Sequence, residues 1–102
     1  MTLKEKLLSD LKEAQRSKDS LRLNTIRSVI SAIKNQEIDL HKELQDEEVL
    51  PLITREVKKR KEAASLFEQG GRLDLMEKEK QEYAILQTYL PEQISEEDLR
   101  KR

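Results

Sequence analysis

Apolar residues recur three and four positions apart along most of the chain, which is the spacing of one face of an α-helix. The first such stretch follows Thr2, a residue suited to cap a helix. A second begins at Asp19 or Ser20, a third follows Asp46, and a fourth runs from about Leu73 to Tyr89. The pattern predicts an all-α protein, a small bundle of four main helices. The apolar stripes of these helices are, in order, Leu3, Leu7, Leu8, Leu11 and Ala14; Leu23, Ile26, Val29, Ile30 and Ile33, with Leu40 in phase near the helix end; Val49, Ile53, Val57, Ala64 and Phe67; and Leu75, Met76, Tyr83, Leu86 and Leu90.

Glycine and proline punctuate the chain at few places, so the predicted helices are long. Gly70 and Gly71 are adjacent and end the third helix. Pro51 falls about five residues after Asp46, where it removes a backbone hydrogen bond. The start of the third helix is therefore left open between Asp46 and a later residue.

The C-terminal residues contain a second helix-start signal. Pro91 ends the fourth helix, and the run from Ser95 to Asp98 has the pattern of a capping box. A fifth helix would thus begin shortly before the sequence ends. We therefore expect a helical bundle domain over residues 1–93, and over residues 94–102 the start of a C-terminal helical domain that is truncated or absent.

Composition narrows the function classes. Charged residues make up 40% of the chain and aromatic residues 3%. The core is therefore thin and largely aliphatic. The net charge of −1 provides no overall field to attract nucleic acid or a membrane. Cysteine is absent and no signal peptide or membrane span is evident, which favours a cytoplasmic protein without membrane association.

The sequence contains no recognisable catalytic constellation. His41 is the only histidine, so without thiols we expect no metal site. The two glycines follow a helix and do not precede one, which excludes a glycine-rich phosphate loop, and no cofactor is expected. These features favour a binding or accessory module over an enzyme, although they leave the enzyme hypothesis open.

Four charged residues fall within the apolar stripes when each helix is drawn as a wheel. They are Arg22 and Glu37 in the second helix, Arg60 in the third and Glu79 in the fourth. An internal polar site is one interpretation. An interhelical ion-pair network that fixes the register is the other, and we favour it because buried charges require partners.

Basic residues mark a candidate RNA-contact surface. Three of them project from the outer face of the third helix, one lies at its flank and two share a polar side of the second helix. In that order they are Arg55, Lys58, Lys59, Lys61, Arg27 and Lys34. Phosphate contacts are one interpretation, and an ordinary solvated face is the other.

Several segments together resemble the YqeY family. The run Leu23–Ile38 is similar to its second helix and Glu56–Glu62 to its third. Arg72–Leu75 with Lys78–Glu79, followed by Tyr89–Leu99, resembles its fourth helix and the junction after it. The resemblance covers nearly the whole chain, in the right order.

The resemblance carries a functional expectation. Proteins of this family are similar to the C-terminal region of GatB, a subunit of the glutamine-dependent tRNA amidotransferase. That region is implicated in holding tRNA, while the glutaminase chemistry belongs to a different subunit. The resemblance thus implies a non-catalytic accessory module with tRNA as partner. It also implies that the family is described by carbon–nitrogen ligase activity with glutamine as amido-N-donor, an activity that this chain would not perform alone. The alternative is a helical module that binds a protein partner and has no RNA role.

Overall fold

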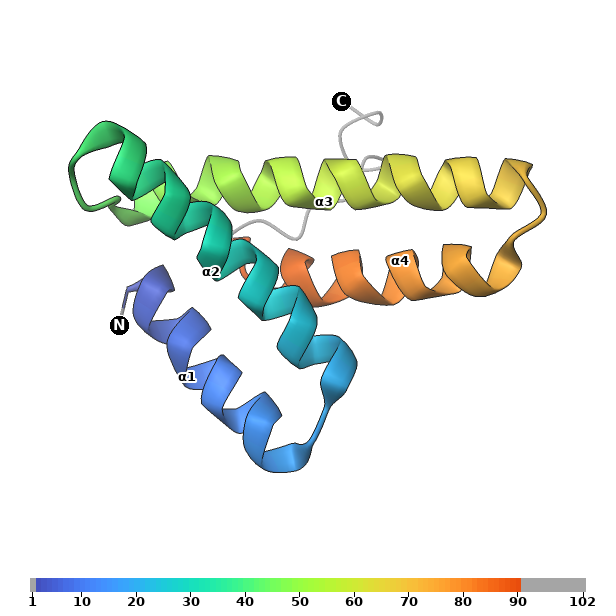
Figure 1. The fold of residues 1–102 in the computed structure, drawn as a ribbon, viewed down its shortest axis with the longest axis horizontal. Coiled ribbons are helices and arrows are strands. Elements are labelled where there is room, and N and C mark those ends of the chain that lie inside the picture. The colour runs from blue at the N-terminus through green and yellow to red at the C-terminus, as the bar shows by residue number, and fades with distance from the viewer. Residues whose placement is uncertain (1, 91–102) are drawn as a thin grey trace, which may run out of the picture.

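The computed structural model describes residues 2–90, which form four α-helices and confirm the predicted all-α bundle. The helices are α1 (Leu3–Ser17), α2 (Ser20–Leu40), α3 (Asp46–Gln69) and α4 (Leu73–Gln87), as Figure 1 shows. The predicted start of a fifth helix and the expected domain boundary after residue 93 lie outside the described residues.

The first two helices begin at the predicted caps. The Thr2 hydroxyl accepts the backbone N–H of Glu5 at 3.1 Å, and the Glu5 carboxylate accepts the backbone N–H of Thr2 at 2.8 Å. The Asp19 carboxylate accepts the backbone N–H of Arg22 and so caps α2. Each cap satisfies a backbone donor that a helix end leaves without a partner.

The third helix begins at Asp46, the earliest start in the range that the sequence left open. Gln45 occupies the cap position, and Asp46 is the first residue of α3. The Asp46 carboxylate instead accepts the backbone N–H of Leu3 at 2.9 Å, so it ties the start of α3 to the start of α1. Pro51 lies inside α3 with an exposed ring and does not delay the helix start.

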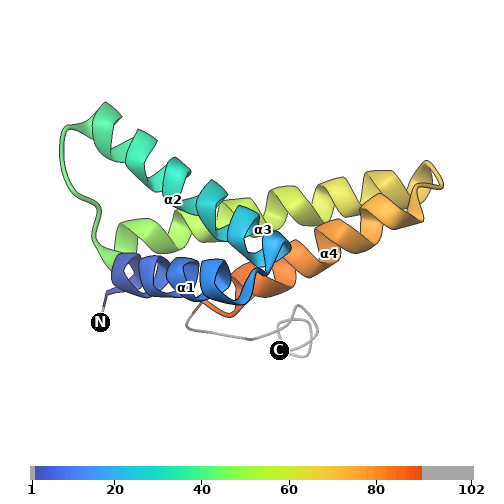
Figure 2. The same ribbon diagram turned by 60° about the horizontal axis from the view of Figure 1, so that its bottom comes forward.

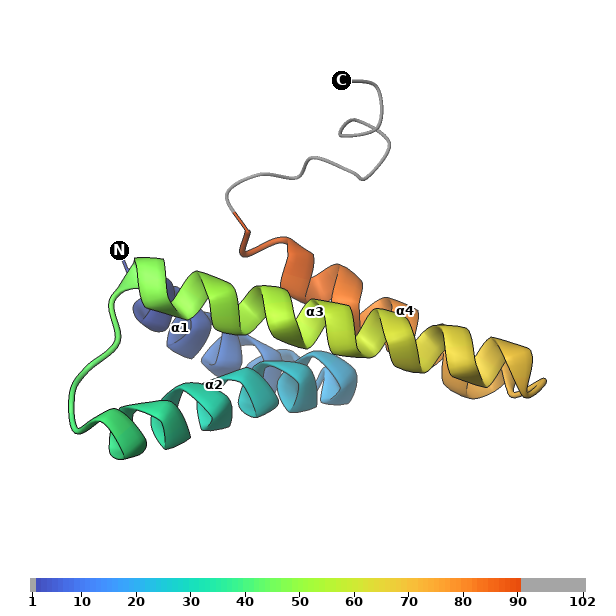
Figure 3. The same ribbon diagram turned by 90° about the horizontal axis from the view of Figure 1, so that it is seen from above.

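The four helices form two antiparallel pairs that cross. α3 and α4 run side by side as a long hairpin, and α1 and α2 pack across it near one end (Figure 1). In Figure 2 the turn between α3 and α4 lies well beyond the α1–α2 pair, and Figure 3 shows the same projection from above. Among residues 2–90, therefore, one end of the hairpin has helices packed against it and the other end has none.

The core lies where the two pairs cross. Leu7, Ile26, Val29, Ile53 and Leu86 are fully buried there and come from all four helices. Three expectations for the apolar stripes were wrong in part. Leu8 is 46% exposed and Leu40 47% exposed, and Phe67, near the free end of the hairpin, is only half-buried.

Candidate functional site

Glu37 is held near the end of α2 by two donors. The Lys4 ammonium donates to the Glu37 carboxylate at 2.5 Å, and the backbone N–H of Leu44 donates to the same oxygen at 2.9 Å. The hydrogen bond from Lys4, followed by that from Leu44, lowers the pKa of Glu37 below its ordinary value. Glu37 thus joins α1, α2 and the loop before α3.

Arg60 and Glu79 belong to a second polar cluster, between α2, α3 and α4. The Arg60 guanidinium donates to the Ser28 hydroxyl at 2.7 Å and lies 3.7 Å from the Glu56 carboxylate. Its Nε atom is buried and has no hydrogen-bond partner within residues 2–90. Burial, and then the neighbouring Glu82, raise the pKa of Glu79, while the charge of Arg60 acts in the opposite direction.

Arg22 forms part of a third cluster. Its guanidinium lies 3.7 Å from the Asp10 carboxylate, which also accepts a hydrogen bond from the Tyr89 hydroxyl. Burial, and then the bond to Asp10, raise the pKa of Tyr89. The last turn after α4 is thereby attached to α1 and α2.

The four internal charges do not form the single network that was expected, although Arg60 and Glu79 share one cluster and the charge of Arg60 lowers the pKa of Glu79. Each is half-buried, but they lie in three separate clusters, and among residues 2–90 no ion pair joins Glu37 to Arg60. The expected single network needs this correction because Glu37 lies near the end of α2, where α1 and the following loop supply its partners. The partners missed from the sequence are Lys4, Asp10, Ser28, Glu56 and Tyr89.

The six candidate RNA-contact residues are also divided. Arg55, Lys58 and Lys59 are exposed on α3, and Lys59 lies 3.4 Å from Glu56 on the same helix. Lys61 is half-buried, and its ammonium lies 5.5 Å from the centre of the Tyr83 ring, against α4. Only the first three thus offer exposed cationic groups on the outer face of α3.

Arg27 and Lys34 lie on another part of the surface. Lys34 lines a cavity between α1 and α2, together with Lys4 and Glu37. Ser28, which meets Arg60, lies on a different side of α2. Lys34 therefore lies on the side of α2 that faces α1, and Arg27, about two turns earlier, is exposed on the same face of α2.

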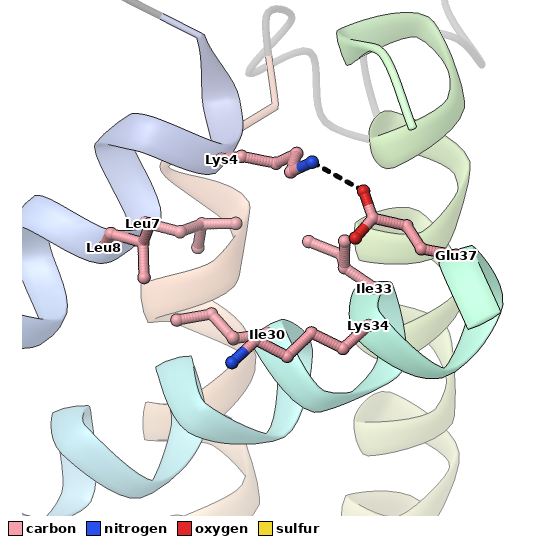
Figure 4. Close-up of a pocket in the computed structure, with 7 residues that line it drawn as sticks. All are labelled: Lys4, Leu7, Leu8, Ile30, Ile33, Lys34 and Glu37. Atoms are coloured by element: carbon pink, nitrogen blue, oxygen red, sulfur yellow. Dashed lines mark hydrogen bonds and ion pairs between the residues drawn. The ribbon is translucent and has the colours of Figure 1, made fainter. Parts of the chain in front are cut away.

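The cavity between α1 and α2 has a volume of about 70 Å³ and an apolar floor (Figure 4). Leu7 and Leu8 of α1 face Ile30 and Ile33 of α2 across it, and the Lys4–Glu37 ion pair closes one end. The sequence indicated the apolar stripes, yet it did not predict that two of them would leave a gap.

The described residues hold no cluster of three or more histidine, cysteine, aspartate or glutamate side chains suited to bind a metal ion. His41 ends α2 in a left-handed backbone conformation, where its backbone N–H bonds to carbonyl groups of the last turn. No helix among residues 2–90 has the length and apolar character needed to span a membrane.

Comparison with known proteins identifies relatives of this chain. The family described as Yqey-like protein matches residues 4–102. A relative named "Altered inheritance of mitochondria protein 41, mitochondrial" from Kluyveromyces lactis is 44% identical over 84 residues, which are 81% of this chain and 45% of the relative. The proteins of the same name from Candida glabrata and Saccharomyces cerevisiae are 42% and 38% identical, over 94% and 82% of this chain and 55% and 46% of their own length.

Two statements follow from these matches. The chain spans about half the length of the curated relatives it matches. The expectation of a cytoplasmic protein is contradicted, because the relatives' printed names place them in mitochondria. Absence of cysteine fits a reducing compartment, but it does not distinguish one such compartment from another.

Proposed function

The chain belongs to the YqeY-like family, and from that premise we propose that it is a non-catalytic accessory module that contacts tRNA through the outer face of α3. The resemblance to the C-terminal region of GatB supports tRNA as the partner. The observation that carries the proposal is the row of exposed cations Arg55, Lys58 and Lys59 along a helix of 24 residues. The division into a bundle domain over residues 1–93 and the start of a second domain over 94–102 is part of the same proposal.

The size of this surface sets the expected strength of binding. Three cations neutralise few phosphates, and the net charge of −1 adds no general attraction. Affinity should therefore lie near the weak end for nucleic acids, with a Kd on the order of 10⁻⁴ M at physiological salt. If all three contact phosphates, the affinity should fall by about 40-fold when salt rises from roughly 50 to roughly 200 mM.

Fluorescence anisotropy with labelled bulk tRNA at both salt concentrations tests the proposal. The triple variant Arg55→Ala/Lys58→Ala/Lys59→Ala should lose nearly all binding at low salt. The matched control is Arg16→Ala/Lys78→Ala/Lys80→Ala, which removes three exposed cations from α1 and α4 and changes the net charge equally. Equal losses in both variants would show only a general charge effect and would refute the α3 surface.

The alternative function, a protein-interaction module, has its own supporting observation. The cavity between α1 and α2 is apolar and lies away from the exposed cations of α3. If the unmodified chain shows no tRNA binding at low salt, the RNA proposal fails and this alternative replaces it.

A further inference from the structure

The floor of the α1–α2 cavity is made of aliphatic side chains. Leu7 is fully buried, while Leu8 is 46% exposed, and both lie across the cavity from Ile30 and Ile33 of α2 (Figure 4). An exposed leucine next to an unfilled apolar gap leaves hydrophobic surface in water. Filling the gap would remove that surface from water and so favours an apolar occupant.

The size of the cavity restricts what can fill it. Sites for free small molecules usually measure roughly 300 to 1,000 Å³. A cavity of roughly 150 Å³ is enough for a benzene molecule. The present cavity, about 70 Å³, therefore suits a single aliphatic side chain that belongs to a larger partner.

The rim of the cavity is basic. Lys4 and Lys34 line it, and Glu37 is the one acid among its lining residues. The Glu37 carboxylate is already held by Lys4 at 2.5 Å, whereas Lys34 is exposed and forms no ion pair within residues 2–90. Lys12, one turn after Leu8, and Arg27, one turn before Ile30, are exposed cations on the same two helices, and Glu5, one turn before Leu8, is an exposed acid.

From the aliphatic floor, the volume and the basic rim, we propose that the α1–α2 cleft docks an acidic amphipathic segment of a partner protein. One aliphatic side chain of that segment enters the cavity between Leu8 and Ile30. Carboxylates on either side of it pair with Lys34 and the neighbouring cations. Burial of the aliphatic group supplies affinity, and the carboxylates fix the orientation.

A protein segment fits this cleft better than a nucleic acid does. The lining residues include no aromatic ring on which a base would stack, and a nucleotide has no aliphatic group to fill the floor. The cleft lies away from the exposed cations of α3, so the two proposals are independent. Loss of the tRNA surface would leave the cleft unchanged.

Designed helical peptides labelled with fluorescein can test the proposal by anisotropy. The first peptide carries one leucine flanked on the same face by two glutamates. In the second, alanine replaces the leucine; in the third, lysines replace the glutamates. The first should bind roughly tenfold to a hundredfold more tightly than the second, because the methyl groups of leucine fill the cavity. It should also bind more tightly than the third, and the difference should shrink at high salt.

Variants of the chain locate the site. Leu8→Glu should weaken binding of the acidic peptide by roughly tenfold or more, because it places a charge at the apolar floor. Lys34→Glu should weaken it while improving binding of the lysine peptide. Both positions are exposed, so the variants should fold, which circular dichroism can confirm. The control is Leu66→Glu, the same change at a leucine that is 67% exposed on the hairpin.

Four outcomes overturn the proposal. In the first, the acidic leucine peptide binds no more tightly than the alanine peptide and no more tightly than the lysine peptide. In the second, Leu66→Glu weakens it as much as Leu8→Glu does. In the third, sedimentation velocity shows that the chain alone forms a dimer that Leu8→Glu dissociates, which identifies a second copy as the occupant. In the fourth, tRNA competes with the bound peptide, which assigns the basic rim to nucleic acid.

Discussion

Two glutamates lie one helical turn apart on the buried side of α4. Glu82 is 8% exposed, and Glu79 is half-buried beside it. Burial raises the pKa of Glu79, the charge of Glu82 raises it further, and Arg60 and Lys78 lower it by less. The ionised form of Glu79 is therefore less favourable in the folded chain than in the unfolded one.

Glu79→Gln should accordingly stabilise the protein at neutral pH. The unfolded chain releases this proton near pH 4.5 and the folded chain at a higher pH, so wild-type stability falls as pH rises across that interval. Because glutamine does not ionise, the variant does not lose this stability as pH rises. After allowance for solvent screening, the gain should be on the order of 0.5 kcal/mol at about pH 7 and absent near about pH 4. Urea unfolding at several pH values measures it, with Glu77→Gln, at an exposed position of the same helix, as control.

The sequence predicted four of the half-buried charges, but it missed the buried Glu82 and did not predict what the four contact. Arg22, Glu37, Arg60 and Glu79 were found because helical periodicity alone places them in the apolar stripes. Their partners lie on other helices or loops, and a contact such as that between Arg60 and Ser28 depends on where two helices cross. Single-helix patterns do not contain that information.

At the scale of elements, residues close in sequence determine most helix boundaries. Thr2 and Asp19 cap α1 and α2 as predicted, because a cap acts through neighbouring backbone groups. The start of α3 was harder to predict, since Asp46 uses its carboxylate to bind Leu3 of α1. Glu48 then satisfies the backbone N–H of Gln45 at 3.0 Å, and the helix begins there in spite of Pro51.

Pro51→Ala should therefore stabilise α3 and the whole chain. Proline is roughly 3 kcal/mol less favourable than alanine inside a helix, although it also restricts the unfolded chain by roughly 0.4 to 1 kcal/mol. A net gain of about 2 kcal/mol is expected, because the ring is exposed and few contacts are lost. Chemical denaturation measures the gain, and Ser65→Ala, at another exposed position of α3, estimates the propensity effect alone. A loss of stability would show that the proline ring packs against something it needs.

At the scale of the whole molecule, the crossing of the two helix pairs determines which surfaces exist. The six basic residues were predicted as candidate RNA contacts on two helices, but Lys34 lines the cavity beside α1, Lys61 contacts the Tyr83 ring of α4, and Arg55 remains exposed. The sequence predicts the helices and their apolar faces. It does not predict the crossing, and so the cavity between α1 and α2 could not be foreseen.

The crossing also predicts an uneven distribution of stability along the α3–α4 hairpin. Leu86 is fully buried where all four helices meet. Leu86→Ala should therefore cost about 2 to 5 kcal/mol, with the cavity it leaves adding to the lost burial. Leu66 is 67% exposed near the free end. Leu66→Ala should accordingly change stability by less than about 0.5 kcal/mol. Urea unfolding followed by circular dichroism measures both variants.

Native-state hydrogen exchange provides a second measurement, in which amides next to Gly70 should exchange through local openings and those near Ile53 only through global unfolding. Equal protection at both ends would mean that the free end of the hairpin is covered by a partner or a second copy of the chain.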